Sequence, residues 1–111
     1  PRVTPNTSVP EVIVEISEKM LGVTAVLEDE KIVGIITDGD IRRMLRKETD
    51  FRKLTAKDIM SAAPKTIENT AMAVDAMDIM EANAISQLLA VEKDKYMGVV
   101  HLHNLIREGI I

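Results

Sequence analysis

Four residues in the stretch GIITDGDIRR, residues 34 to 43, have the types and spacing of a small-molecule contact: Thr37, Asp38, Gly39 and Asp40. They follow an apolar run that predicts a strand, and they begin a stretch that predicts a helix. A helix N-terminus offers unpaired N–H donors and the positive end of the helix dipole, so it favours an anion. Asp40 is a poor partner for phosphate but can accept hydrogen bonds from two hydroxyls, which suits a diol.

The same residues also have a purely structural interpretation, which the sequence leaves open. Asp38 would cap the helix that it begins, and Gly39 would serve either a close backbone approach or a tight turn. Arg42, Arg43 and Arg107 lie in the helices that are predicted after the two strand ends. An arginine fork pairs bidentately with phosphate or carboxylate, whereas an arginine that faces solvent needs no ligand.

A second candidate cluster comprises His101, His103 and Asn104. Histidines near a helix N-terminus can donate to phosphate or carboxylate, and they titrate near neutral pH. Two other interpretations stay open, namely a structural or oligomer contact and a zinc or nickel site. The metal signal is weak, because two histidines two residues apart without cysteine lack the usual ligand spacing. We therefore predict no metal site and no cofactor.

Composition limits the classes of function. The 111 residues suffice for one compact domain or for two small halves that share a core. A net charge of -4 disfavours a nucleic-acid binder, and the absence of cysteine fits a reducing cytoplasm. No apolar run approaches the roughly 20 residues of a membrane span. No Ser/His/Asp or paired-carboxylate arrangement is singled out, so we predict no catalytic residue in this chain.

The elements that position both clusters come from an internal repeat. The run Gly34-Ile35-Ile36-Thr37 recurs as Gly98-Val99-Val100-His101, 64 positions later, and Asp40 and Arg43 correspond to Asn104 and Arg107 at the same offset. Each copy therefore predicts the same succession of elements.

Each copy predicts a helix, a hairpin and a second helix after its first strand. Apolar residues at helical spacing predict the first helices: Val9, Val12, Ile13 and Ile16 in one copy, and Ala73, Ala76, Met77 and Met80 in the other. Their expected N-caps are Thr7 or Ser8, and Asn69 or Thr70. Strands are expected at 23–27, 32–37, 87–91 and 96–101, joined by charged turns longer than two residues, and the closing helices at 38–47 and 102–108.

The domain boundaries follow from the repeat. We expect a first repeat at 1–49 that begins within the repeat unit, a polar linker at 50–57, and a second repeat at 58–111. The missing initiator Met suggests a piece of a longer chain.

This βαββα duplication, with the lead-in Asp58-Ile59-Met60, the following Pro64 and the Gly-apolar-apolar-Thr-x-x-Asp ending, resembles a tandem pair of cystathionine β-synthase (CBS) domains, a Bateman module. The resemblance covers essentially the whole chain. It implies an α+β fold in which two repeats pack about a pseudo-twofold axis, with the sheets facing each other and the helices outside.

A narrower resemblance is to the C-terminal CBS pair of bacterial D-arabinose 5-phosphate isomerases. It rests on residues 22–26, on Thr37-Asp38-Gly39-Asp40, on residues 87–89 and on His101-Leu102-His103. In that family catalysis belongs to a separate sugar isomerase domain, in the pathway to the lipopolysaccharide sugar Kdo. Asn104 departs from the pattern, since the family more often has aspartate there.

The resemblance implies further roles. In nucleotide-binding CBS domains the threonine of Thr-x-x-Asp contacts phosphate and the aspartate contacts ribose. By position in the CBS pattern Thr24, Lys65, Thr66 and Gln87 are lesser ligand candidates. The implied function is regulatory sensing of a nucleotide or nucleotide-sugar, either CMP-Kdo or an adenine nucleotide, beside the chain's own isomerase domain. The alternative is a structural module that holds a homodimer of CBS pairs together without a ligand.

Overall fold

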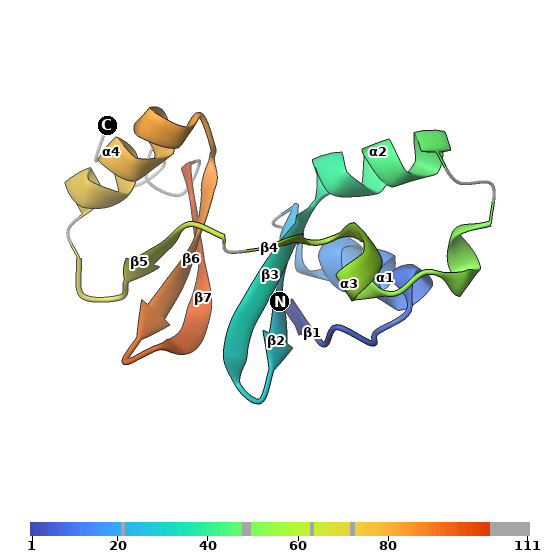
Figure 1. The fold of residues 1–111 in the computed structure, drawn as a ribbon. Coiled ribbons are helices and arrows are strands. Elements are labelled where there is room, and N and C mark those ends of the chain that lie inside the picture. The colour runs from blue at the N-terminus through green and yellow to red at the C-terminus, as the bar shows by residue number, and fades with distance from the viewer. Residues whose placement is uncertain (21, 48–49, 63, 72, 103–111) are drawn as a thin grey trace. The chain divides into compact units, whose positions relative to one another are not determined.

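The computed structural model of this chain describes residues 1–20, 22–47, 50–62, 64–71 and 73–102. The chain forms two compact units, Pro1–Pro64 and Lys65–Ile111 (Figure 1). Each unit has its own sheet and its own hydrophobic core.

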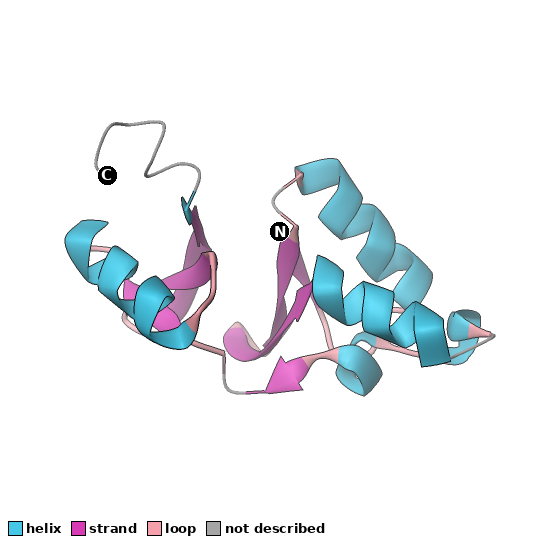
Figure 2. Ribbon diagram, turned by 90° about the horizontal axis from the view of Figure 1, so that it is seen from above, coloured by secondary structure: helices cyan, strands magenta, loops and turns pink. Residues whose placement is uncertain are grey.

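The first unit is built on a four-stranded sheet in the order β1-β2-β3-β4. The strands are β1 (Arg2–Val3), β2 (Val23–Glu28), β3 (Lys31–Thr37) and β4 (Ser61–Ala62). β1 pairs with β2 in parallel, and the other two pairs are antiparallel. The helices α1 (Val9–Lys19) and α2 (Asp38–Lys47) lie on one side of this sheet, as Figures 1 and 2 both show.

Helix α1 forms where the apolar periodicity predicts it. Val9, Val12 and Ile16 are buried in the core of the first unit, and Ile13 packs against that core. Ser8 is the N-cap, since its side chain accepts a hydrogen bond from the Glu11 N–H at 3.5 Å. The 3.6-residue repeat therefore predicts both the helix and the face that it buries.

The second unit repeats this plan with a three-stranded sheet, β5-β6-β7. Its elements are β5 (Thr66–Glu68), α4 (Ala73–Asn83), β6 (Gln87–Glu92) and β7 (Lys95–His101). Ala76 and Met80 of α4 are buried with Ile67 and Leu88, and Ala73 and Met77 pack against them. The predicted stripe of this helix is confirmed.

The two units share one strand register at an offset of 64 positions. Val23 pairs with Thr37, and Gln87 pairs with His101 in the same way. Even an irregularity is repeated, because the register shifts between Val26 and Leu27 and again between Ala90 and Val91. The sequence repeat is thus a structural repeat down to the same bulge.

Two local predictions were wrong. The hairpin turns contain two residues, because Glu28 pairs with Lys31 and Glu92 with Lys95. Asp29 and Glu30 have φ of 52° and 70°, the positive values that a tight type I′ connection requires, although neither residue is the glycine that usually signals it. In the second unit α4 begins at Ala73, so Asn69 and Thr70 lie too far upstream to cap it.

The segment expected to link the repeats packs into the first unit. It contains a 3₁₀ turn, η1 (Phe51–Lys53), and the start of α3 (Ala56–Ile59). Ala56 is fully buried, and its N–H donates to the Thr7 carbonyl at 2.8 Å. This segment is therefore part of the first core.

After α3 the chain adds β4 to the edge of β3, where Gly34 pairs with Ala62. A Cβ on Gly34 would lie 2.5 Å from Met60 Sδ and 3.0 Å from the Ser61 carbonyl oxygen. The glycine therefore allows the close approach of this strand. Of the helix expected at 102–108, only Leu102 is among the described residues, and it packs against the core of the second unit.

Candidate functional site at the strand-to-helix turn

The residues at the end of β3 form a capping box on α2. The Thr37 N–H donates to Asp40 Oδ2 at 2.9 Å, and the Asp40 N–H donates to Thr37 Oγ1 at 3.2 Å. The Thr37 hydroxyl also donates to Asp40 Oδ2, at 3.2 Å. Each residue thus satisfies an amide of the other, which is the reciprocal geometry of a capping box.

Asp40 is buried, with 9% of its surface exposed, and its other carboxylate oxygen pairs with Arg43. The Arg43 side chain is 63% exposed, so its remaining N–H groups face solvent. One turn therefore combines a fixed carboxylate with a largely free guanidinium.

The backbone of this turn is tied to the start of β2. The Asp38 N–H donates to the Gly22 carbonyl at 3.0 Å, and Gly22 has a φ of 71°. Asp38 is exposed and does not act as the cap, because Thr37 takes that position. Gly39 is helical, and a Cβ there would have its nearest contact at 3.4 Å, so no residue that the structure describes requires a glycine at this position. The amides on either side of Gly39 already donate hydrogen bonds, that of Asp38 to the Gly22 carbonyl and that of Asp40 to the Thr37 hydroxyl.

The other predicted residues are divided between the units. Thr24 is fully buried in β2, and its hydroxyl donates to the Ala25 carbonyl, so it is a core residue of the first unit. In the second unit Gln87 and His101 are paired across β6 and β7, while Lys65 and Thr66 are exposed at and just before β5. Of the predicted site residues, the structure brings together Thr37, Asp38, Asp40 and Arg43.

Arg42 is exposed on α2. The described residues do not include three of the predicted ones, His103, Asn104 and Arg107. Within the described part of the chain, no group of three or more His, Cys, Asp or Glu side chains is placed to hold a metal ion.

A cavity of about 240 Å³ adjoins the turn on the flank of α2. It is lined by Asp40, Arg43, Met44, Lys47, Leu54, Asp58 and Ile59. The sequence prediction did not include Lys47 or Asp58. A signal for each was present, because Lys47 follows Arg43 at helical i, i+4 spacing and residues 55–58 repeat the Thr-x-x-Asp pattern of residues 37–40.

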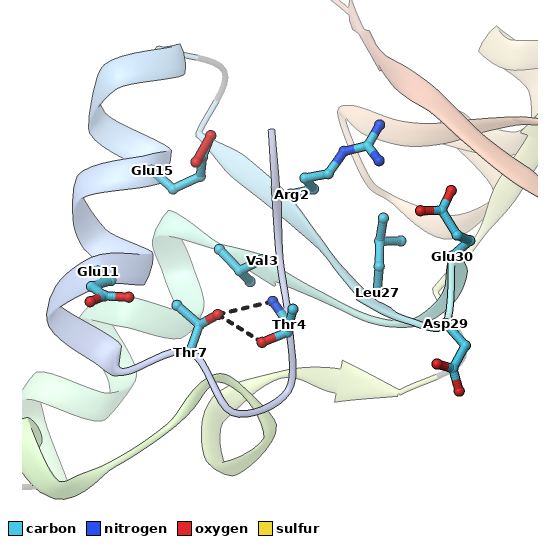
Figure 3. A pocket seen from close by; sticks show the side chains of 9 residues that line it. All are labelled: Arg2, Val3, Thr4, Thr7, Glu11, Glu15, Leu27, Asp29 and Glu30. Carbon is cyan, nitrogen blue, oxygen red and sulfur yellow. Dashed lines mark hydrogen bonds between the residues drawn. The ribbon is translucent and has the colours of Figure 1, made fainter.

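A larger cavity, of about 700 Å³, lies elsewhere in the first unit, between β1, α1 and the β2–β3 turn (Figure 3). Four of its lining residues are acidic: Glu11 and Glu15 from α1, and Asp29 and Glu30 from the turn. None of the predicted site residues lines it. The candidate site is therefore the turn at the start of α2.

Comparison with known proteins identifies the repeat. A profile of the CBS domain family matches residues 1–47 and 56–110. The arabinose 5-phosphate isomerase KdsD of Yersinia pestis is 36% identical over 112 residues, and that of Pseudomonas aeruginosa is 37% identical over 113 residues. Both alignments span this whole chain but only 34% and 35% of those proteins.

Solved structures agree on the fold. A crystal structure of a CBS domain superposes with a TM-score of 0.89 at 22% identity, covering 99% of this chain and 87% of that one. A CBS domain protein from Pyrobaculum aerophilum complexed with AMP has a TM-score of 0.85 at 20% identity, over 94% of this chain and 81% of the other. No helix in the described part of the chain is long and apolar enough to cross a membrane. The repeated elements, the capped turn that ends the first copy's hairpin and the profile match together place this chain in the CBS domain family, as a pair of CBS domains.

Proposed function

We propose that this CBS pair is a regulatory module that senses a nucleotide or nucleotide-sugar through the turn of residues 37–40. The same proposal makes it part of a cytoplasmic arabinose 5-phosphate isomerase, whose separate isomerase domain it would control. Support for the parent activity comes from the KdsD relatives, of which this chain spans about a third. Support for the ligand class comes from a related fold that was solved with AMP.

The state of the Asp40 carboxylate carries the proposal. Three donors reach it, namely the N–H and hydroxyl of Thr37 and one nitrogen of Arg43. A carboxylate has about four acceptor positions, so one remains for a ligand hydroxyl. If a phosphate draws the exposed Arg43 away, two positions become open, which suits the diol of a ribose.

The N-terminus of α2 supplies the complementary anion contact. The Gly39 N–H lies at the positive end of a ten-residue helix, and Gly39 has no side chain to block it. A ribose phosphate therefore has an acceptor for its hydroxyls and a donor for its phosphate within one turn. The end product CMP-Kdo adds a carboxylate, for which an arginine is a suited partner.

Calorimetry and thermal shift with AMP, ATP, CMP, S-adenosylmethionine and CMP-Kdo test this proposal. At 100 times its dissociation constant a ligand adds about 2.7 kcal/mol to stability, which raises the Tm of a small domain by about 10 °C. We expect such a shift with at least one nucleotide, and a preference for the cytidine compounds if the module senses CMP-Kdo.

The variant Asp40→Asn is expected to weaken that binding at least tenfold, because the amide cannot accept a diol on both of its atoms. Asp29→Asn makes the same substitution at an exposed turn position with positive φ, which asparagine tolerates, and should leave affinity unchanged. If no compound of the panel raised the Tm or bound in calorimetry, or if Asp40→Asn and Asp29→Asn lost affinity equally, ligand sensing at this turn would be contradicted.

A second role is favoured by the apolar surface of α1 and α2. Val14 on α1 is 53% exposed and Leu45 on α2 is 49% exposed. A groove of about 200 Å³ between these helices is lined in part by Ile13, Ile16 and Ile41. We propose that this face joins two copies of the CBS pair in a homodimer.

Sedimentation velocity on Leu45→Glu tests the dimer. A charge at this exposed apolar position should weaken self-association at least tenfold if the proposed interface buries it, since burying an unpaired carboxylate is costly. Val74→Glu places the same charge at a 57% exposed position on α4 and should leave the dimer intact. A wild-type chain that sediments as a monomer at high micromolar concentration would count against the proposal.

A further inference from the structure

The cavity on the flank of α2 differs in chemistry from the turn beside it. Helices α2 and α3 are in contact, and their side chains line an open cavity together with Leu54. Its volume of about 240 Å³ is below the roughly 300–1,000 Å³ of pockets that hold drug-sized ligands. A compact molecule therefore fits it better than a whole nucleotide.

Helix α2 contributes two cationic side chains to the cavity. Arg43 and Lys47 are four residues apart on α2, so their side chains lie on the same face of the helix. Arg43 uses one nitrogen to hold Asp40 and keeps other donors for a second partner. Lys47 forms no hydrogen bond or ion pair with the described residues, and it is exposed at the cavity. Two cations side by side favour a phosphate.

The lining residues from α3 include an acceptor. Asp58 belongs to a second capping box, in which its Oδ2 accepts from the Thr55 N–H at 2.8 Å and from the Thr55 hydroxyl at 3.1 Å. Its Oδ1 takes part in neither bond and can accept from a ligand hydroxyl. Asp40 also lines the cavity, but three donors already reach its oxygens, whereas among the described residues Asp58 accepts only from Thr55.

The other lining residues are apolar. Met44 is buried, and Leu54 and Ile59 are partly buried and pack against the core of the first unit. A lining that combines two cations, a carboxylate and apolar side chains suits a short carbon chain or small ring that carries both a phosphate and hydroxyls.

We propose that the cavity between α2 and α3 is a second ligand site, specific for a compact phosphorylated polyol of the sugar-phosphate class. Arg43 and Lys47 hold the phosphate, Asp58 accepts from a hydroxyl, and the carbon skeleton lies on Met44, Leu54 and Ile59. The site lies on the flank of α2 and shares Arg43 and the lining residue Asp40 with the turn of residues 37–40, whereas Lys47 and Asp58 belong to the cavity alone.

Titration of the ¹⁵N-labelled chain with D-ribose 5-phosphate, followed by NMR, tests the site. We expect saturable amide shifts at residues 43–47 and 54–59. Inorganic phosphate and D-ribose, each carrying half of the recognised groups, should bind at least tenfold more weakly, because hydrogen bonds to charged groups contribute about 1.5–3 kcal/mol each. Phosphate that binds as tightly as ribose 5-phosphate would reduce the cavity to a simple anion site and overturn the proposal.

The chain offers a matched pair of variants. Lys47→Gln and Arg46→Gln each remove one exposed positive charge from the last turn of α2, but only Lys47 lines the cavity. We expect Lys47→Gln to weaken ribose 5-phosphate about tenfold and Arg46→Gln less than twofold. Equal losses would show general attraction to a basic helix end, and an absence of shifts at tens of millimolar ligand would show that the cavity is not a site. Either result overturns the proposal.

Discussion

Val12→Ala is expected to lower the free energy of unfolding of the first unit by about 2 kcal/mol. Val12 is fully buried in α1 and belongs to the core that joins this helix to β2 and β3. The substitution removes two methyl groups at about 0.8 kcal/mol each and leaves a cavity that neighbouring side chains fill only in part. The higher helix propensity of alanine offsets about 0.5 kcal/mol of that loss.

The control is Val14→Ala, the same substitution two positions along the same helix. Val14 is 53% exposed, so it loses little burial and keeps the gain in helix propensity. We expect it to be neutral or to stabilise by a few tenths of a kcal/mol. The chain has no Trp, and its one Tyr, Tyr96, lies in β7 of the second unit, so urea unfolding of the first unit is best followed by NMR signals of β2. Similar effects of the two variants would contradict the assigned orientation of α1.

Asp40→Ala is expected to cost about 2 kcal/mol, twice the cost of Asp58→Ala. Both residues close a capping box with a threonine three positions earlier. Loss of a cap costs about 1 kcal/mol. At Asp40 the loss is larger because the residue is buried, and the Thr37 amide is left without its acceptor in a partly buried place. The ion pair with Arg43 adds little, because the arginine is 63% exposed.

Chemical denaturation of the two variants, with Arg43→Ala as a third, separates these contributions. Arg43→Ala should cost less than about 1 kcal/mol, as exposed ion pairs do. If Arg43→Ala were as costly as Asp40→Ala, the ion pair rather than the capping box would be the main support of the turn. Equal costs for Asp40→Ala and Asp58→Ala would mean that the burial of Asp40 contributes nothing.

The sequence predicts the fold well where its signal is local and repeated. The stripe of Val9, Val12 and Ile16 has a 3.6-residue period, and a copy 64 positions later confirms the order of elements. The sequence pattern did not predict that the segment around Ala56 packs into the core of the first unit. Backbone hydrogen bonds join it to Pro5, Thr7 and Val9, far away in sequence. Its polar composition conceals how much of it packs against the core.

For the candidate site, the sequence pattern is limited because it has two structural meanings. The pattern Thr-x-x-Asp predicts a ligand contact at residues 37–40, and the same pattern is a capping box, because both need a threonine at a helix start and an acceptor three residues later. Spacing alone cannot separate the two, and Thr55 with Asp58 shows that the chain uses the box again at α3. Lys47 was missed because an exposed lysine in a last helical turn is ordinary.

The addition of β4 to the edge of β3 has a consequence for how the chain folds during its synthesis. On the ribosome, β1, β2, β3, α1 and α2 are all synthesised before Ala56 and β4 exist. Until then the backbone of Gly34 and Ile35 lacks the partners that Ala62 and Ser61 later provide. A nascent chain that stalls at this stage presents an open strand edge to its neighbours on the same polysome, which is the arrangement from which aggregation starts. Translation through residue 62 is therefore what covers this edge of β3.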